Sequence, residues 1–495
     1  MYIKKCLKYL FALTILLALA LTACSSSNGD PDTTQEDNQN NDGGYINNDD
    51  PVEPEPPGIP FPEVGSTIRV AFVGGWWEDP SLFDFVFDNF REMYPQFEIY
   101  RMLPMPTSRD LLASIQAGEQ PDFWLGTDTQ WAQYATSAYE RLMMPLNDFL
   151  ERDPFVNFET LDSEIMDMFR FFNGNYYGLP YATAHQVLVW NRDMFARSGL
   201  PDRPPETWSE MLEFSQQLIR LNTDGMATQV GFSGAGTEGP FLYQILPSLR
   251  TGELDDYGLW ANMTTPIIEE AHRFANEFHN MIDGIQIPGF IYSFSMGTAG
   301  MAIANLSQLS SFSEAGIDFG LAPIPRPDDD DRPPVIPSII WQFGGIPYGA
   351  HNPEGGWLFL THVMTEVTFS MARNDMLRSP GTALPAHAAH VPTRDRIENF
   401  FLAQANERTA EIWHERNHIF ATTPLFSRRA SPLAYELSNI SNSWNSRRLE
   451  EGISLSDFLR GIEDEYNSVL QTWMRGMEGQ GWEFPHGGTP VPPQN

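Results

Sequence analysis

Lysine is almost absent from this chain of 495 residues. Its three lysines, Lys4, Lys5 and Lys8, lie at the N-terminus, and every other basic residue is arginine. P-loop nucleotide hydrolysis, kinase-type phosphoryl transfer and Schiff-base catalysis each depend on a lysine. These activities are therefore nearly excluded for the rest of the chain.

Positive charge of any kind is scarce. The chain has 30 basic residues against 65 acidic ones, which gives a net charge of −35. Because nucleic acids are bound by concentrated basic surfaces, we expect no nucleic-acid partner. The hydrophobic share of 42% is sufficient for large cores, and the length suggests two or three domains.

Cysteine occurs only at Cys6 and Cys24. Residues 1–23 have a basic start and an apolar run that is too short for an ordinary membrane span, and they end in Leu-Thr-Ala before Cys24. This ending resembles the bacterial lipobox, which implies a lipoprotein signal peptide over 1–23 and lipidation of Cys24. The alternatives are an ordinary secretory signal or an uncleaved anchor. After cleavage no intramolecular disulfide and no Cys-ligated zinc cluster can form.

Both ends of the mature chain have the composition of flexible segments. Residues 24–63 are dominated by Ser, Asn, Asp, Gly and Pro, with almost nothing to bury. We interpret them as an acidic disordered tether, whose typical reach is roughly 30–40 Å. Residues 481–495 are predicted to be a flexible tail.

The globular body begins with alternating strand and helix signals. Strands are predicted at Thr67–Val73, Phe97–Leu103 and Asp122–Leu125, with helices from Pro80 and over Ser108–Ala117 between them. This order predicts right-handed crossovers and a mostly parallel sheet. Ligands of such sheets bind beyond the carboxyl ends of the strands, where 74–79 and 126–131 follow.

Further along, helix starts and buried strands continue the pattern. Thr207-Trp208-Ser209-Glu210 is a capping box, and Pro266 begins another amphipathic helix. The remaining predicted elements are buried strands at Gly300–Asn305 and Ile317–Pro323 and a long helix over Ser456–Arg475 whose inner face holds Leu459, Ile462, Tyr466, Val469, Leu470 and Trp473. The four aspartates Asp328–Asp331 lack the spacing and glycine of a calcium loop, which favours a solvated surface loop.

Four stretches resemble the bacterial solute-binding lipoproteins of ABC importers, the family with maltose- and oligosaccharide-binding proteins. The most specific runs from Tyr177-Gly178-Leu179-Pro180-Tyr181 through Val189–Phe195 to Glu206–Glu210. The others are Pro121–Asp128, Gly300–Ile303 with Phe319–Pro325, and Gly344–Ile346 with Glu354–Met364 and Gly381–Ala386. Together they cover most of residues 66–390 in the order of the family.

The resemblance implies an α/β, two-lobe periplasmic-binding-protein fold of type II-like topology, with extra C-terminal helices. Hinge strands would cross near 179–183, 338–344 and 383–392. Lobe one would comprise 64–180 plus 343–384, and lobe two 184–338 plus 390–480. A protein of this kind is not an enzyme and needs no cofactor. It closes on a solute by a hinge motion and delivers it to membrane permease subunits. We expect a monomer, lipid-anchored at the extracellular or periplasmic face of the cell membrane, with an oligosaccharide as its ligand.

A sugar offers apolar ring faces and a rim of hydroxyls, so its cleft requires aromatic, acidic, amide and arginine side chains. The predicted ligand-binding residues are Trp76, Trp77, Asp128, Trp131, Tyr181, Glu238, Phe241, Asn305, Trp341 and Arg378. At most one of the two consecutive tryptophans stacks, because neighbours on an extended chain face opposite ways. The roles of Asp128, Tyr181, Glu238, Phe241 and Asn305 are implied by the resemblance. The aromatic residues are equally compatible with core packing, and Arg378 with a surface ion pair.

His414-Glu415-Arg416-Asn417-His418 supports a rival interpretation, because it matches the H-E-x-x-H motif of zinc peptidases, with Glu436 available as a third ligand. A cation at Arg416 and the helix-ending Pro424 argue against zinc. A non-sugar solute, such as a polyol, a glycerol phosphodiester or a peptide, is a further alternative. A glycoside hydrolase and a structural adhesin are less favoured, since no carboxylate pair stands out and an adhesin leaves the lobe pattern unexplained.

Overall fold

The structure is a computed structural model. It describes residues 64–72, 80–102, 105, 108–127, 142–170, 174–233, 259–281, 285, 294–305, 308–329, 331, 333–378, 387–423, 425–426, 433–479 and 483–484. The predicted signal peptide, Cys24 and the predicted tether up to residue 63 lie outside these residues, as does the predicted tail apart from 483–484.

The first elements follow the predicted order. They are β1 (Thr67–Phe72), α2 (Pro80–Met93), β2 (Glu98–Arg101), α3 (Ser108–Ala117) and β3 (Phe123–Thr127). β1 pairs in parallel with both β2 and β3. Gly118 ends α3 with φ of 71°, a left-handed conformation that glycine adopts without strain.

Two long strands carry the sheet onward. After α6 (Asn147–Arg152) and α7 (Ser163–Phe169), β4 runs over Leu179–Asn191, and β9 over Ile336–Gly345 lies beside it. The strand order is β2-β1-β3-β9-β4, followed by β7 (Ala299–Asn305), β6 (Ala227–Phe232) and β5 (Arg220–Leu221). β9 pairs antiparallel with both β3 and β4. The parallel sheet predicted from the sequence therefore holds for β2-β1-β3, whereas the centre of the sheet is antiparallel.

The next part of the chain surrounds the far half of β4. Its elements are α8 (Arg192–Ser198), α9 (Trp208–Leu218), β5 (Arg220–Leu221), β6 (Ala227–Phe232), α11 (Pro266–Met281), β7 (Ala299–Asn305), α12 (Leu309–Glu314) and β8 (Phe319–Ala322). Thr207 caps α9, since its side chain accepts a hydrogen bond from the Glu210 N–H, but the Glu210 carboxylate accepts from the Glu206 N–H and not from Thr207 as a full capping box requires. Asp328 is exposed, as predicted, and its carboxylate accepts hydrogen bonds from the Ser209 N–H and hydroxyl.

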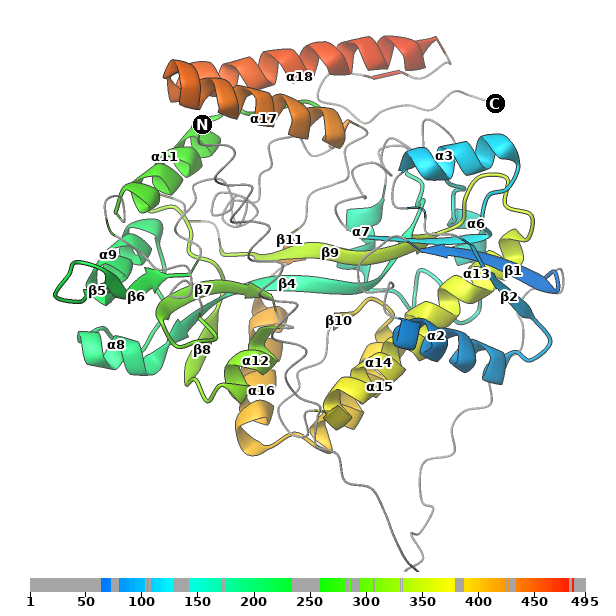
Figure 1. Cartoon of the computed structure of the whole chain (residues 1–495), viewed down its shortest axis with the longest axis horizontal. Helices are drawn as coiled ribbons and strands as arrows, with labels where there is room; N and C mark the ends of the chain where they lie inside the picture. Colours follow the sequence, from blue (N-terminus) through cyan, green and yellow to red (C-terminus); the bar gives the residue numbers. More distant parts are fainter. Residues whose placement is uncertain are drawn as a thin grey trace, which may run out of the picture. The chain divides into compact units, whose positions relative to one another are not determined.

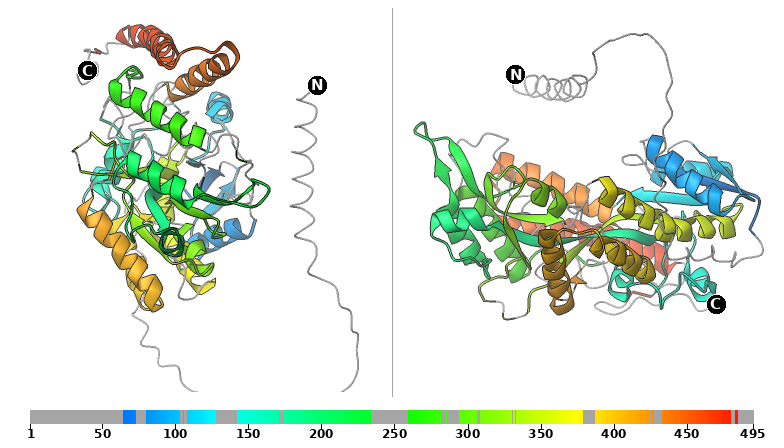
Figure 2. Two further views of the ribbon diagram at one scale, coloured as in Figure 1. Left: turned by 90° about the vertical axis from the view of Figure 1, so that its left-hand side faces the viewer. Right: turned by 90° about the horizontal axis from the view of Figure 1, so that it is seen from below.

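The rest of the chain is largely helical. After β9 come α13 (Pro353–His362), the π-helix η5 (Val363–Val367), α14 (Thr368–Arg378), β10 (His387–Ala388), α15 (Val391–Leu402), α16 (Glu407–Thr422), β11 (Leu425–Phe426), α17 (Ala434–Glu451) and α18 (Leu455–Glu478). α17 and α18 form a hairpin whose arms lie side by side (Figures 1 and 2). The predicted inner face of α18 is confirmed at Leu459, Ile462, Tyr466 and Leu470, but it is wrong at Val469, which is 36% exposed.

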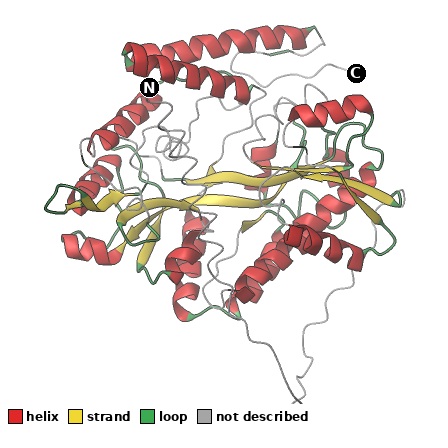
Figure 3. Ribbon diagram, viewed as in Figure 1, coloured by secondary structure: helices red, strands yellow, loops and turns green. Residues whose placement is uncertain are grey.

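Helices cover both faces of the sheet (Figure 3). One core lies around β1–β3 and α13, with Phe123 and Trp357 at its centre. On the far half of the sheet, alternate residues of β4 enter two different cores. Leu188 and Trp190 pack with α9, α11 and α18, whereas Val187 and Val189 pack with α12 and α16. This alternation separates the two faces of β4 without ambiguity. Among the described helices, none has the length and apolar character that a bilayer span requires.

Candidate functional site

β3 ends against the long central strands, since its last residue, Thr127, pairs with Gln342 of β9, and Ala182 of β4 pairs with the same residue. Six of the ten predicted ligand residues lie outside the described residues: Trp76, Trp77, Asp128, Trp131, Glu238 and Phe241. Their roles remain predictions.

Three more predicted residues are placed by their backbone alone. Tyr181 lies in β4 and Trp341 in β9, at a register shift between the two strands. This pairing brings the two backbone positions together. Arg378 is the last residue of α14.

Asn305 is the predicted ligand residue whose surroundings the structure describes most fully. It ends β7, and its backbone N–H donates to Oε1 of Gln308 at 2.8 Å. Its side-chain Oδ1 is buried, with no hydrogen-bond partner in the described part of the chain.

Gln186 of β4 lies directly opposite Asn305 in the β4–β7 register. It is only 7% exposed, and its Oε1 likewise has no partner among the described residues. Gln186 is not among the ligand-binding residues predicted from the sequence. Its one signal was a polar residue beside the apolar run Val187–Trp190, and periodicity alone does not tell such a residue from a strand end.

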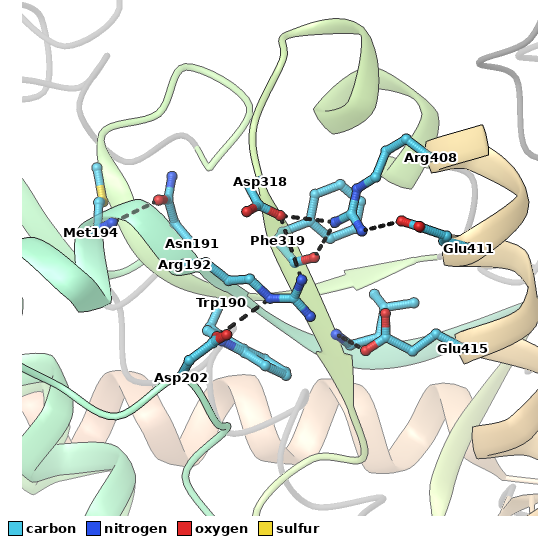
Figure 4. Close-up of polar contacts among 11 residues, drawn as sticks. Trp190, Asn191, Arg192, Met194, Asp202, Asp318, Phe319, Arg408, Glu411 and Glu415 are labelled. Atoms are coloured by element: carbon cyan, nitrogen blue, oxygen red, sulfur yellow. Dashed lines mark hydrogen bonds and ion pairs between the residues drawn. The ribbon is translucent and has the colours of Figure 1, made fainter. Parts of the chain in front are cut away.

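The glutamate of the H-E-x-x-H motif is bonded to the backbone of a neighbouring strand. His414 and His418 are exposed on α16, whereas the Glu415 carboxylate accepts a hydrogen bond from the Leu321 N–H at 3.2 Å (Figure 4). Leu321 belongs to β8, which among the described strands pairs with β4 alone. Glu415 therefore satisfies a backbone donor of a strand that has no second neighbour in the described part of the sheet.

Other α16 side chains extend this junction. Arg408 donates to the Phe319 carbonyl at 2.7 Å and to Asp318 at 3.1 Å (Figure 4). Arg416 is 3% exposed, its guanidinium lies 4.0 Å from the Trp413 ring centroid, and burial lowers its pKa to about 9. No group of three or more His, Cys, Asp or Glu side chains suited to a metal occurs among the described residues. α16 thus packs along the edge of β8, and its side chains bond to backbone groups of that strand.

A cavity of about 630 Å³ lies between α7, α15 and α16. Its polar side chains are largely bonded to one another. Trp413 and Asn417 both donate to Oε1 of Glu398, at 2.7 and 2.9 Å, and Arg394 pairs with Asp162 at 2.7 Å. Phe420, which also lines it, contacts the ring of His185, the neighbour of Gln186 on β4. Because consecutive strand residues face opposite ways, this cavity and the Gln186–Asn305 pair lie on opposite faces of β4.

The central antiparallel strands and the helices on both faces are those of the two-lobe periplasmic solute-binding fold, as the resemblance in the sequence implied. A model of the bacterial extracellular solute-binding protein family matches residues 104–367, more than half of the chain. The chain belongs to this family.

Individual relatives bind different solutes. A maltotriose-binding protein of Pyrococcus abyssi is 23% identical over 294 residues, which are 57% of this chain and 58% of the relative. The chain therefore spans less than two thirds of that protein. An ABC substrate-binding protein of Listeria monocytogenes, solved with cycloalternan, has a TM-score of 0.59 and 16% identity, covering 82% of this chain and 99% of the other. UgpB of Mycobacterium tuberculosis, solved with glycerophosphocholine, has a TM-score of 0.58 and 18% identity, covering 83% and 100%.

Proposed function

We propose that this protein captures an oligosaccharide between its two lobes and delivers it to the permease of an ABC importer. The family match carries the proposal, since members of this family bind solutes outside the cell and are not a class of enzyme. The choice of a carbohydrate is supported by the maltotriose-binding relative and by the cycloalternan complex of the structural neighbour.

In this proposal the lobes are 64–180 plus 343–384 and 184–338 plus 390–480, and β4, β9 and the segment around β10 are the hinge. β4 is shared, because its first residues pair with β9 and its last with β7. Small backbone changes near the register shift at Ala182 would rotate one half against the other. Ligand contacts made by both lobes favour the closed state, which is the only route by which the solute can drive closure.

We also propose that the mature protein is a monomer held at the outer face of the membrane by a lipid on Cys24 and by the acidic tether. The lipobox-like end of the leader supports this arrangement. Metabolic labelling with radioactive palmitate tests it. Label is expected on the wild-type protein and not on Cys24→Ala, and label retained by the variant would contradict the anchor.

A thermal-shift panel tests the ligand class. It contains maltotriose, mannotriose, cycloalternan, glycerol 3-phosphate and glycerophosphocholine. A ligand at about 100 times its Kd stabilises the folded protein by about 2.7 kcal/mol, which raises the unfolding midpoint by a few degrees. We expect an oligosaccharide to do so and to be recovered unchanged. Hydrolysis of any compound, or stabilisation only by the phosphate compounds, would contradict the proposal.

A glycerol phosphodiester is the second candidate, because UgpB of Mycobacterium tuberculosis has a similar fold and was solved with glycerophosphocholine. The same panel separates this candidate from an oligosaccharide.

A further inference from the structure

Gln186 and Asn305 are two amides facing each other at the point where β4 leaves the hinge. His185 is the last β4 residue that pairs with β9, at Ser338, and Gln186 is the first that pairs with β7, at Asn305. Side chains of directly opposed residues in an antiparallel pair emerge on the same face, with Cβ atoms about 4.5–5.5 Å apart. The two amides therefore form one polar unit across the two strands.

The face that carries this unit follows from the alternation of β4. Two residues further along β4 and two residues back along β7, Leu188 and Ile303 belong to the core that contains α9, α11 and α18. Gln186 and Asn305 continue that row toward the hinge. The opposite face, with His185, is occupied by Phe420 of α16. The amides thus lie on the face turned away from the α7–α15–α16 cavity.

Both amides present a carbonyl oxygen that is buried and has no hydrogen-bond partner among the described residues. An unsatisfied buried acceptor destabilises a folded protein, so such atoms are normally bonded. Other amides of the same half of the molecule are bonded. Asn191 accepts from the Met194 N–H, and Asn467 both accepts from and donates to the backbone of Ala261. Ser215 Oγ and both ring nitrogens of His272 are also buried without a hydrogen-bond partner among the described residues, but Gln186 and Asn305 differ from them in facing each other across two paired strands.

We propose that Gln186 and Asn305 form a subsite that binds hydroxyl groups of a neutral, polyhydroxylated solute. This proposal rests on the proposed function. It identifies the part of lobe two that contacts the ligand. A hydroxyl donates its proton to an amide oxygen and can accept from the amide N–H₂, so two adjacent amides match two adjacent hydroxyls. The non-bridging oxygens of a phosphodiester only accept, so a phosphate group cannot bond to the two carbonyl oxygens, whereas hydroxyl groups can. The subsite thus binds hydroxyl groups of the solute and not a phosphate group.

The test uses the full chain and two readouts, the unfolding midpoint of the ligand-free protein and the Kd for maltotriose or mannotriose by calorimetry. Gln186→Met removes the amide at similar volume, and Asn305→Leu does so on the opposing strand. Asn467→Leu is the matched control, because the amide that it removes is fully bonded to the protein. A second substitution at the first site, Gln186→Leu, covers the case in which Gln186→Met folds poorly.

We expect Gln186→Met and Asn305→Leu each to weaken carbohydrate binding about tenfold without lowering the unfolding midpoint of the free protein. Asn467→Leu should lower the midpoint and leave Kd unchanged. A lower midpoint for Gln186→Met, like that of the control, would show that the amide has a structural partner and would overturn the subsite. Unchanged Kd in both hinge variants would overturn it while the proposed function stands. If the wild-type protein binds no carbohydrate, the proposed function fails and the subsite fails with it.

Discussion

His362, at the end of α13, is a histidine inside the hydrophobic core. It is 2% exposed, neither ring nitrogen has a hydrogen-bond partner among the described residues, and Phe90, Tyr94 and Phe359 surround it. Burial lowers its pKa to about 3, so the ring is neutral in the folded protein. A depressed histidine pKa contributes stability that is present above the unfolded value of about 6.5 and is lost as the pH falls toward 3.

We expect acid to destabilise the protein by up to about 1.4 kcal/mol per pH unit below pH 6 through this residue. His362→Phe removes the titrating group, so urea unfolding between pH 7 and pH 5 should become less dependent on pH. His414→Phe, which changes an exposed ring on α16, is the control and should retain the wild-type slope. Equal slopes for wild type and His362→Phe would refute this explanation.

Asp153 is a buried carboxylate with three donors. Its Oδ1 accepts from the N–H groups of Phe155 and Val156, and its Oδ2 accepts from Trp357 Nε1 at 2.6 Å. Asp153→Asn keeps one oxygen as an acceptor for the two backbone N–H groups. Its N–H₂ group then faces the indole N–H of Trp357, so two donors oppose each other without an acceptor. We expect this variant to lose about 2–3 kcal/mol in unfolding free energy.

Trp357→Phe in the same background removes the indole donor and should restore part of the loss, which a double-mutant cycle measures. Additive effects of the two substitutions would mean that the bond contributes nothing.

At the scale of helices and strands, prediction from the sequence succeeded where the signals were local. Pro80 and Pro266 begin helices, Gly118 ends one, and Thr207 caps another, as the residue types indicated. The antiparallel centre of the sheet was not predicted, because the pairing of β4 with β9 joins segments about 160 residues apart and leaves no mark in either one. The pairing of Gln186 with Asn305 could not be predicted for the same reason, because it depends on the register between β4 and β7.

α16 shows how a motif misleads when its environment is unknown. Glu415 matches the catalytic glutamate of a zinc motif, yet its carboxylate accepts the Leu321 N–H at the edge of β8. Glu415→Gln keeps an acceptor at this position, whereas Glu415→Ala leaves the N–H without one. We therefore expect Glu415→Gln to be nearly neutral and Glu415→Ala to lower the unfolding free energy by about 1–3 kcal/mol.

Chemical denaturation of both variants checks this expectation, and ligand affinity should change in neither. Equal destabilisation by Gln and Ala would show that the negative charge is required, rather than an acceptor.

For the whole molecule, the excess of acidic residues matters most. Both proposed lobes, 64–180 plus 343–384 and 184–338 plus 390–480, contain more Asp and Glu than Arg. Closing two negatively charged bodies on a solute brings like charges together, which opposes closure at low ionic strength. The Debye length falls from about 30 Å at 0.01 M to about 10 Å at 0.1 M salt, so added salt screens repulsion across a cleft.

We therefore expect the affinity for a neutral oligosaccharide to increase a few-fold between about 10 mM and about 300 mM NaCl. A neutral ligand forms no ion pair that salt would weaken. The increase in affinity therefore measures only the electrostatic repulsion between the lobes that opposes closure. Calorimetry over this range of salt checks the sign, and scattering from the ligand-free protein should show a more closed particle as salt rises. An affinity that falls with salt would instead mean that the ligand is held by charge, which would favour an anionic solute such as a glycerol phosphodiester over a sugar.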